Sequence, residues 1–284
     1  MILVTGATGT TGRATVNALV AQGAPVRAFV RRPDAALPDG VERAVGSFEE
    51  PTALAAALAG VERAYLVTIP APGMRDQEAA FLKAAADAGV RHVVRLSVLE
   101  ADAAAPAHLT AREHAAGEQA LRDSGIAWTM LRANAFAQNL LMQASAIADH
   151  GIYASPLTAS AAVSLVDADD IGSVAAATLT QSGHEGRAYS LTGPQALNDD
   201  DVVACLSDVL GRPITRVVPS REEAASGLRA TGLPEFLVDQ IKSLWTYFES
   251  GQAAPLHGDI LQVTGRPANS LRDVIERHRD VFSG

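Results

Sequence analysis

The sequence predicts an α/β protein with a doubly wound parallel sheet, and three observations lead to that prediction. Short β-branched runs alternate with Ala- and Leu-rich stretches of helical length through the first half of the chain. A glycine stands between most helical stretches and the next apolar run, where a left-handed residue commonly ends a helix. The first apolar run leads directly into a glycine-rich turn. Strands that alternate with helices in this way form βαβ units, so we expect a Rossmann sheet.

The expected elements follow in order along the chain. Their apolar runs are continuous, as is typical of strands that are buried on both faces. Strands are predicted over residues 1–5, 25–30, 61–67, 90–96 and 126–131. Helices are predicted between them over residues 13–22, 51–59, 74–88 and 110–124. Later elements are a strand over 163–166, a helix over 169–179 and a helix over 199–210 with Asn198 as its cap.

Composition excludes several classes of protein. The 284 residues include 23 Lys and Arg against 32 Asp and Glu, a formal charge of −9 that disfavours binding to nucleic acids or anionic membranes. Cys205 is the single cysteine, so neither a disulfide within the chain nor a cysteine metal site is expected. With no apolar run of about 18 residues and no leader-like start, the chain is expected to be soluble and cytoplasmic. Both a monomer and a homodimer are compatible with the sequence.

The glycine-rich turn has the spacing Gly-x-x-Gly-x-x-Gly and lies between a strand and a helix. Glycines let the backbone approach a pyrophosphate closely, and the following helix presents free N–H groups and the positive end of its dipole. We therefore expect a dinucleotide here; a tight turn without a ligand is the alternative. The residues expected to contact it are Gly6, Thr8, Gly9, Thr10, Thr11 and Gly12.

Arg31 and Arg32 end the second predicted strand. An NAD site carries an acidic side chain at about this distance from the glycines, to bind the ribose 2′-hydroxyl. A guanidinium instead pairs with a 2′-phosphate, so the sequence favours NADP(H) over NAD(H). The alternative is that the two arginines only end a strand at the surface.

The chain is expected to divide in two. Residues 1–150 would form the dinucleotide-binding Rossmann domain, with residues 160–182 returning to it. Gly- and Pro-containing turns become frequent after Gly186. Residues 183–284 would therefore form a smaller substrate-binding lobe over the carboxyl edge of the sheet, where doubly wound folds bind ligands.

Five segments together resemble the NmrA-like atypical short-chain dehydrogenase/reductases: residues 6–12, 30–33, 131–136, 166–171 and 189–194. The resemblance spans nearly the whole chain and is weakest after about Gly227. It implies an NADPH-dependent reductase of quinones or secondary metabolites, or a redox-sensing regulator that binds the dinucleotide without turnover. It also implies that Ser47 and Phe48 lie near the adenine, although many relatives have Asp where Ser47 stands. The residues it places beside the cofactor at the end of a strand are Thr68, Ile69 and Pro70.

The proton donor of the wider superfamily is missing. Its usual pattern is a Ser, then Tyr-x-x-x-Lys, with a Glu four residues beyond the Lys. Ser97 lies in the Ser position, with a further expected contact to the cofactor, and Glu118 fixes the later register. That register puts Thr110 in the Tyr place and His114 in the Lys place. A Thr hydroxyl is far less acidic than a phenol and cannot replace it as a general acid.

This absence favours an electron-poor conjugated acceptor. An ordinary ketone needs a positioned acid, whereas a quinol oxygen ionises near a pKa of ~10 and needs little help. His114 would orient the cofactor or relay a proton, or would be an ordinary surface histidine. His108 is a second candidate donor, from a loop. No histidines and carboxylates have metal-ligand spacing and no Gly-x-Ser-x-Gly elbow occurs, so neither a metal site nor a serine hydrolase is expected.

The substrate-binding side of the cleft is expected to be lined by polar and aromatic residues that follow the predicted strand at 126–131. These are Asn134, Phe136, Gln138 and Asn139. Trp245 belongs to an apolar stretch with helical spacing, which forms either core or one wall of the cleft. The leading hypothesis is reduction of a quinone or polycyclic aromatic ketone, such as a polyketide-type quinone whose quinol reoxidises with oxygen. The alternatives are a dinucleotide sensor without turnover and a reductase of an enone or imine.

Overall fold

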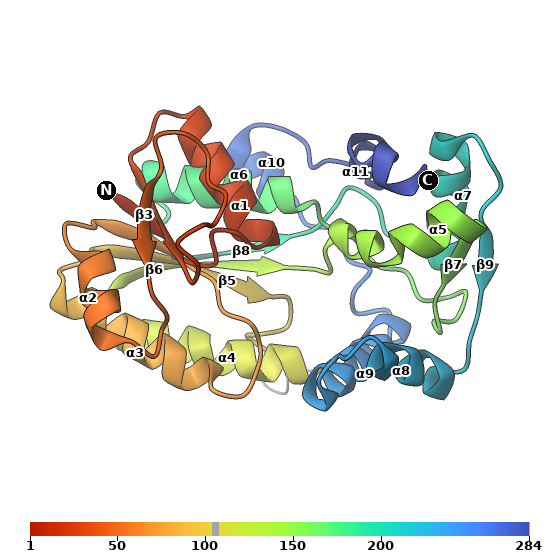
Figure 1. Cartoon of the computed structure of the whole chain (residues 1–284), viewed down its shortest axis with the longest axis horizontal. Coiled ribbons are helices and arrows are strands. Elements are labelled where there is room, and N and C mark those ends of the chain that lie inside the picture. The colour runs from red at the N-terminus through yellow and green to blue at the C-terminus, as the bar shows by residue number, and fades with distance from the viewer. Residues whose placement is uncertain (104–107, 284) are drawn as a thin grey trace.

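Seven parallel strands form the centre of the molecule. The computed structural model describes residues 1–103 and 108–283. The strands follow the order β3-β2-β1-β4-β5-β6-β8, so the order reverses between β1 and β4. Figure 1 shows this sheet between its two layers of helices. Their bounds are β1 (Ile2–Val4), β2 (Val26–Val30), β3 (Glu42–Val45), β4 (Arg63–Leu66), β5 (His92–Val98), β6 (Ala127–Ala133) and β8 (Arg187–Leu191). A doubly wound parallel sheet is thereby confirmed.

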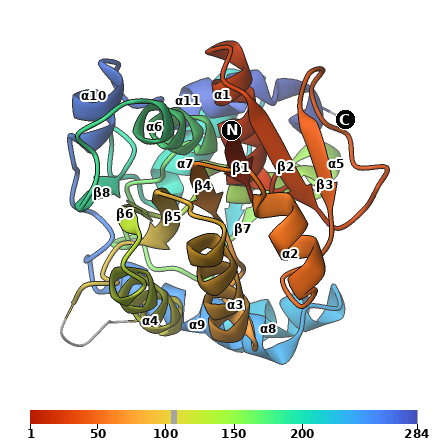
Figure 2. The same cartoon turned by 90° about the vertical axis from the view of Figure 1, so that its left-hand side faces the viewer.

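Helices cover both faces of this sheet, as the end-on view in Figure 2 shows. One face carries α1 (Thr10–Ala21) and α6 (Ala168–Thr180), with α10 (Asp259–Thr264) packed against α6. The other carries α2 (Pro51–Leu58), α3 (Met74–Asp87) and α4 (Leu109–Asp123). Gly172 lets α1 and α6 approach closely, since a Cβ there would lie 2.5 Å from the backbone of Ala14.

Side chains that alternate in direction along each strand contribute to two apolar cores, one on each face of the sheet. Val4 points into the core beneath α1 and α6, whereas its neighbour Leu3 packs with residues of α2, α3 and α4. Both side chains are fully buried. Successive side chains of a strand face opposite sides of the sheet, so the continuous apolar runs in the sequence reflect helices on both faces.

A second body lies beyond the carboxyl edge of the sheet, on the right of Figure 1. Its upper part holds η1 (Ala137–Gln143), α5 (Ala144–His150), α7 (Asp199–Leu210), α11 (Leu271–Arg277) and η2 (Arg279–Phe282). A two-stranded parallel sheet joins β7 (Ile152–Ala154) to β9 (Thr215–Val217). Its lower part is the helix pair α8 (Arg221–Ala230) and α9 (Glu235–Glu249). We call this whole body the lobe.

Two expectations about the chain path were wrong. Residues 163–166 do not form a strand, because Val163 bridges Leu197 in antiparallel and Val166 bridges Phe136 in parallel, each as an isolated pair. The sheet also continues past residue 182, because β8 pairs with β6 along five residues. Conversely, η1, α5 and β7 pack with the lobe although they precede residue 160. The chain therefore crosses between the two bodies more often than the expected boundaries imply.

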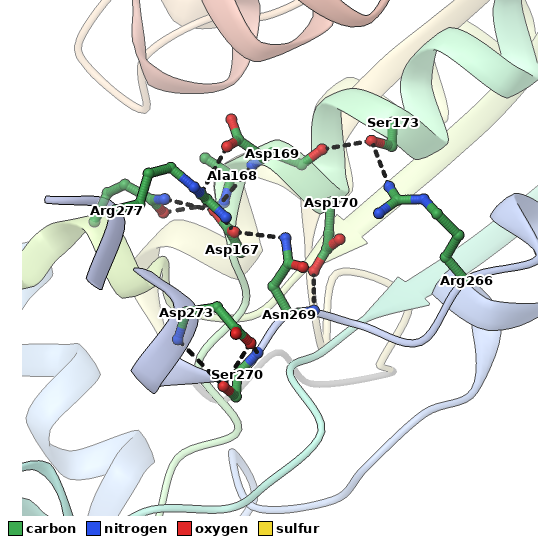
Figure 3. A network of polar contacts seen from close by, with 11 residues as sticks. Asp167, Ala168, Asp169, Asp170, Ser173, Arg266, Asn269, Ser270, Asp273 and Arg277 are labelled. Atoms are coloured by element: carbon green, nitrogen blue, oxygen red, sulfur yellow. Dashed lines mark hydrogen bonds and ion pairs between the residues drawn. The ribbon is translucent and has the colours of Figure 1, made fainter. Parts of the chain in front are cut away.

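A polar network fastens the C-terminal segment to α6 (Figure 3). The Asp167 carboxylate caps α6 by accepting from the backbone N–H of Asp169, and it accepts further hydrogen bonds from Asn269, at 2.8 Å, and Arg277, at 2.9 Å. The neighbouring Asp170 accepts from the backbone N–H of Asn269 at 2.6 Å. This is the segment 166–171 that the sequence singles out, and its role here is to anchor the chain.

Candidate active site

The glycine-rich turn has the geometry of a phosphate cradle. Gly6 adopts a φ of +57°, and its carbonyl accepts a hydrogen bond from the Gly9 N–H at 2.8 Å. A Cβ at Gly12 would lie 2.1 Å from the Gly6 oxygen, and one at Gly9 would lie 3.2 Å from it. The turn thus closes on itself only because these positions lack side chains.

The open side of this turn is accessible. Thr8, Gly9 and Thr10 are exposed, whereas Thr11 and Gly12 are buried in the packing of α1. Gly9 is the N-cap of α1 and provides no side-chain cap, so the first N–H groups of the helix stay available to an anion. The residues present therefore fit a dinucleotide pyrophosphate.

Arg31 and Arg32 lie at the carboxyl end of β2, next to β1 in the sheet. Both side chains are exposed, and Arg32 lies 3.9 Å from Asp34. Ser47 donates a hydrogen bond to Glu50 at 3.0 Å. Phe48 packs edge-on against Phe29 and Phe81, which makes it part of the rim of the apolar core.

A buried network connects the end of β4 to α4. Thr68 donates to Glu78 at 2.5 Å, and Glu78 pairs with Arg95 at 2.8 Å. Arg95 in turn donates to His114 Nδ1 at 3.1 Å. Burial, together with the positive charge of Arg95, places the pKa of His114 well below its usual value. His114 is therefore a neutral residue of the interior and not the surface histidine considered above.

A second buried network holds Ser97. Its hydroxyl donates to Glu118 at 2.7 Å, and the same carboxylate pairs with Arg132 at 2.7 Å. Arg132 also pairs with Asp102 in the segment after β5, at 2.5 Å. Neither Ser97 nor His114 lines the cavity described next. Ser97 is bonded to Glu118 of α4, and His114 is bonded to Arg95 of β5.

A large cavity lies between the carboxyl edge of the sheet and the lobe. Its volume is about 810 Å³, and its wall is mostly apolar. The sheet side includes Leu99 and Phe136, and α9 contributes Leu244 and Trp245. Helix α9 is tied to the Rossmann side, since Gln240 donates to the Pro70 carbonyl and Ser243 accepts from the Leu109 N–H.

His108 and Thr110 line this cavity from the start of α4. His108 is the N-cap of α4, and its Nδ1 accepts from the Ala111 N–H at 3.2 Å. The ring lies 4.6 Å from that of Tyr247. Burial lowers the pKa of His108 to about 4, so the imidazole is neutral near pH 7. Its Nδ1 is already occupied by the backbone of α4.

Four of the five residues expected on the substrate side line the cavity, namely Asn134, Phe136, Asn139 and Trp245. The Asn134 amide is committed to Ser164 at 2.7 Å and to the Ala253 carbonyl at 2.8 Å. Asn139 is exposed at the rim, whereas Trp245 is buried and also belongs to the lobe core. Gln138, expected beside them, instead donates to Asp167 at 2.6 Å and does not reach the cavity.

Comparison with known proteins agrees with this geometry. A family model described as the NmrA-like family matches residues 1–276. The chain belongs to the NmrA-like family. This NmrA-like protein is 38% identical over 287 residues to the NAD(P)H azoreductase of Xenophilus azovorans, with 99% of each chain covered.

Two further similarities extend across the whole chain. Over 285 residues it is 38% identical to the (4-alkanoyl-5-oxo-2,5-dihydrofuran-3-yl)methyl phosphate reductase of Streptomyces griseus, covering 100% of this chain and 99% of that one. It also matches the NADPH complex of the quinone oxidoreductase QOR2 from Escherichia coli, with a TM-score of 0.86 and 28% identity. That match covers 98% of this chain and 100% of the other. The predicted class, an NAD(P)H-dependent oxidoreductase of the NmrA-like type, is thereby confirmed.

Sequence reasoning missed several groups that this NmrA-like cavity contains. Tyr153 and Asp199 line its lobe end, where the tyrosine hydroxyl donates to the carboxylate at 3.0 Å. Tyr247 and Glu223 also line it. No local pattern marks Tyr153, and Asp199 reads as part of a helix start. Tyr247 could have been found, since it lies in the apolar helical stretch that includes Trp245.

The described residues contain neither a candidate membrane-spanning helix nor a candidate metal site. No helix there combines the length and apolar character needed to cross a membrane. No group of three or more His, Cys, Asp or Glu side chains there is arranged to hold a metal ion.

Proposed function

We propose that this protein is an NADPH-dependent reductase of quinones and related delocalised aromatic acceptors, acting without a general acid from the chain. The observation that carries the proposal is the state of the polar groups around the cavity. The Nδ1 of His108 is bonded to the backbone and burial keeps the imidazole neutral, and Thr110 occupies the position where the resemblance puts the tyrosine donor. The amide of Asn134 is also committed. Such a cavity is suited to hydride transfer to an acceptor that delocalises the negative charge it gains.

Some residues of the site would bind the cofactor, and others would position it. The turn from Gly6 to Gly12 would bind the pyrophosphate, and Arg31 with Arg32 would bind a 2′-phosphate. The bound nicotinamide supplies the hydride. The backbone of Thr68, Ile69 and Pro70 would flank it at the end of β4. Glu78 and Arg95 hold Thr68 in place from below.

The cavity supports a flat substrate. Its volume of about 810 Å³ lies within the usual range for small-molecule sites, ~300–1,000 Å³. Aromatic rings of Phe136, Trp245, Tyr247 and Phe248 contribute to its wall. Such rings stack favourably on a planar acceptor, and an apolar wall excludes water from the hydride. The named substrates of the relatives, a quinone and azo compounds, are acceptors of this kind.

A panel of acceptors tests the proposal. We expect NADPH oxidation with 1,4-naphthoquinone and none above background with a saturated cyclic ketone of similar size. Oxygen uptake measured in parallel reports whether the quinol reoxidises. Turnover of the simple ketone at a comparable rate would contradict the proposal, because that reaction requires a positioned acid. Tight NADPH binding with no turnover of any acceptor would favour the dinucleotide sensor.

A conjugated enone is the second candidate substrate. It is favoured by the similarity to the Streptomyces griseus reductase, whose named substrate is a phosphate ester that carries an unsaturated lactone. Hydride addition to the double bond also leaves a delocalised charge and demands no tyrosine. Including a 2-acyl butenolide in the same panel separates the two candidates.

A further inference from the structure

Three polar side chains gather at the lobe end of the cavity, away from the groups that the proposed function uses. Tyr153 of β7 and Asp199 of α7 both line this end. Gln143 of η1 also lines the cavity and lies beside them, since its Oε1 accepts from the Ala154 N–H at 2.8 Å. β7 and α7 lie at the right of Figure 1, away from the strands of the central sheet. Three separate elements thus bring hydrogen-bonding groups to the end of the cavity that is remote from the sheet.

The carboxylate of Asp199 is the central group of this end. Its side chain is only 6% exposed, and one of its oxygens accepts from the Tyr153 hydroxyl at 3.0 Å. The other oxygen accepts from the Arg216 guanidinium at 3.2 Å. An ionised carboxylate has about four acceptor sites, so these two bonds leave capacity for a donor in the cavity. Because Arg216 already supplies the counter-ion, that donor can be a neutral group.

Tyr153 is not the proton donor that the superfamily pattern lacks here. Its hydroxyl hydrogen is committed to Asp199, and burial together with the Asp199 charge raises the pKa of the phenol. A phenol with a raised pKa is a poorer general acid than an ordinary tyrosine. Tyr153 is therefore a positioning residue, which holds the carboxylate in place at the wall of the cavity.

Gln143 provides a donor to complement this acceptor. The bond from the Ala154 N–H to its Oε1 fixes the orientation of the amide. Within the part of the chain that the structure describes, the Nε2 of this amide makes no hydrogen bond. The lobe end therefore offers an acceptor and a donor together. A hydroxyl is the neutral group that can use both, since it donates one hydrogen bond and accepts others.

The cavity is large enough for an acceptor that reaches both of its ends. Its volume of about 810 Å³ lies in the upper part of the usual range for small-molecule sites, ~300–1,000 Å³. A two-ring acceptor beside Phe136 and Trp245 fills only part of this space. An apolar substituent that filled the rest would remove water from Asp199 and leave the carboxylate without a replacement donor, whereas a hydroxyl would restore the lost hydrogen bond.

We infer that the lobe end of the cavity is a hydrogen-bonding subsite for a neutral hydroxyl group on a substituent of the acceptor, with Asp199 accepting its hydrogen bond. The inference rests on the proposed function and defines the substrate class more closely, as a flat conjugated ring system with a hydroxylated side chain. No bond is made or broken at the subsite. It determines which acceptor is bound and takes no part in the transfer of the hydride.

The test uses 1,4-naphthoquinones that carry a saturated linker at one ring position. The linker ends in a hydroxyl, a methoxy or a methyl group, so the redox core stays the same and only the hydroxyl can donate. Propyl, hexyl and nonyl linkers are compared, because the group must reach the lobe end. At the best length and with saturating NADPH, we expect kcat/KM for the hydroxyl compound to exceed that of both others by at least about tenfold, equivalent to ~1.4 kcal/mol. A ratio near one at every length would overturn the inference.

Binding without turnover separates this inference from the proposed function. Naphthalenes that carry the same linkers are not reduced, so calorimetric titration measures the subsite alone. We expect the hydroxyl compound to bind at least about tenfold more tightly than the methoxy compound. If no quinone is reduced but the naphthalenes follow this order, the subsite stands and the proposed reaction fails. If the quinones are reduced and the naphthalenes bind alike, the subsite alone fails.

A pair of neighbouring variants assigns the effect to one carboxylate. Asp199→Asn should reduce the hydroxyl-to-methoxy ratio at least about threefold, because a neutral amide accepts more weakly than a carboxylate. Asp200→Asn is the matched control, since Asp200 is exposed, pairs with the same Arg216 at 3.0 Å and does not line the cavity. Urea denaturation shows that both variants are folded. An unchanged ratio in Asp199→Asn, or an equal fall in the control, would refute the assignment to Asp199.

Discussion

At the scale of one residue, Arg31 is the side chain that we expect to discriminate between NADPH and NADH. It lies exposed at the carboxyl end of β2, and Arg32 beside it lies 3.9 Å from Asp34. We expect wild type to bind NADPH at least about tenfold more tightly than NADH, since one charge-assisted phosphate contact supplies more than ~1.4 kcal/mol. Arg31→Asp should remove this preference, as measured by titration of both cofactors.

Arg32→Asp is the matched control for this prediction. If both substitutions weaken NADPH equally, the two arginines share the phosphate. If neither affects the ratio, they only end a strand at the surface, and the argument for NADP(H) from the sequence is lost.

A substitution at Thr110 tests whether this position takes part in proton transfer. It lines the cavity in the tyrosine place, and its hydroxyl is too weak an acid to act as the donor. We expect Thr110→Ala to leave kcat for naphthoquinone within about tenfold of wild type, below the ~10²–10⁴ of a true general acid. Steady-state rates at saturating NADPH measure this. A loss of about a thousandfold would place a proton relay at this position.

The sequence allowed some of these residues to be predicted and not others. The turn from Gly6 to Gly12 was predictable because backbone geometry alone specifies it. Ser97 lies on β5 and His114 on α4, but their environment depends on Arg132 and Arg95, which come from neighbouring strands. A pairing between strands leaves no mark at a fixed spacing in sequence. The same holds for Tyr153, which meets Asp199 only in the folded protein.

At the scale of elements, Gly117 shows why α4 and the sheet fit together. A Cβ at this position would lie 2.1 Å from Glu78 Oε2 and 2.2 Å from a guanidinium nitrogen of Arg95. We expect Gly117→Ala to destabilise the protein by at least about 2 kcal/mol, because it displaces a buried ion pair. Urea denaturation measures the change. Intrinsic helix propensity alone predicts the opposite sign, a gain of ~1 kcal/mol.

Gly227→Ala is the control in a different helix. Gly227 lies within α8, and a Cβ there would meet nothing within 4 Å. Alanine should therefore stabilise the protein by up to about 1 kcal/mol. If both substitutions stabilise, the buried pair tolerates displacement and the proposed constraint on α4 is absent.

Helices and strands were predicted most accurately where the capping residues and the hydrophobic pattern indicate the same boundary. Asn198 caps α7 as expected, and the capping box with Asp201 explains why its start was found at the correct residue. The start of α1 was placed three residues late, because Gly9 caps it without a side chain. β8 was not predicted, since residues 187–191 contain no continuous apolar run and lie at the edge of the sheet. Its partner β6 identifies it only in three dimensions.

At the scale of the whole molecule, buried histidines set the dependence of stability on pH. Burial lowers the pKa of His92 and of His108 to about 4, and it lowers the pKa of His114 well below 6.5. An unfolded chain holds these three side chains at the ordinary value near 6.5. Between the two values the unfolded state binds more protons than the folded state, so acid favours unfolding.

One buried carboxylate acts in the opposite direction. Burial raises the pKa of Asp170 to about 6, so between 3.8 and 6 the folded state holds the extra proton and this group loses stability as pH rises. Glu118 and Asp167 have lowered pKa values and lose stability on acidification, as the histidines do. The groups that favour unfolding in acid outnumber Asp170.

We therefore expect the free energy of unfolding to fall steeply from about pH 7 to pH 4.5, by up to ~3 kcal/mol for each fully shifted histidine. His108→Asn should flatten this dependence, because asparagine keeps the N-cap of α4 and does not titrate. Replacing the exposed His257 by asparagine provides the control and should leave the slope unchanged. Denaturant titrations at several pH values give both slopes. If His108→Asn and wild type lose stability in parallel, the carboxylate networks of Glu118 and Asp167 dominate acid unfolding, and the imidazole in the cavity wall is protonated without cost.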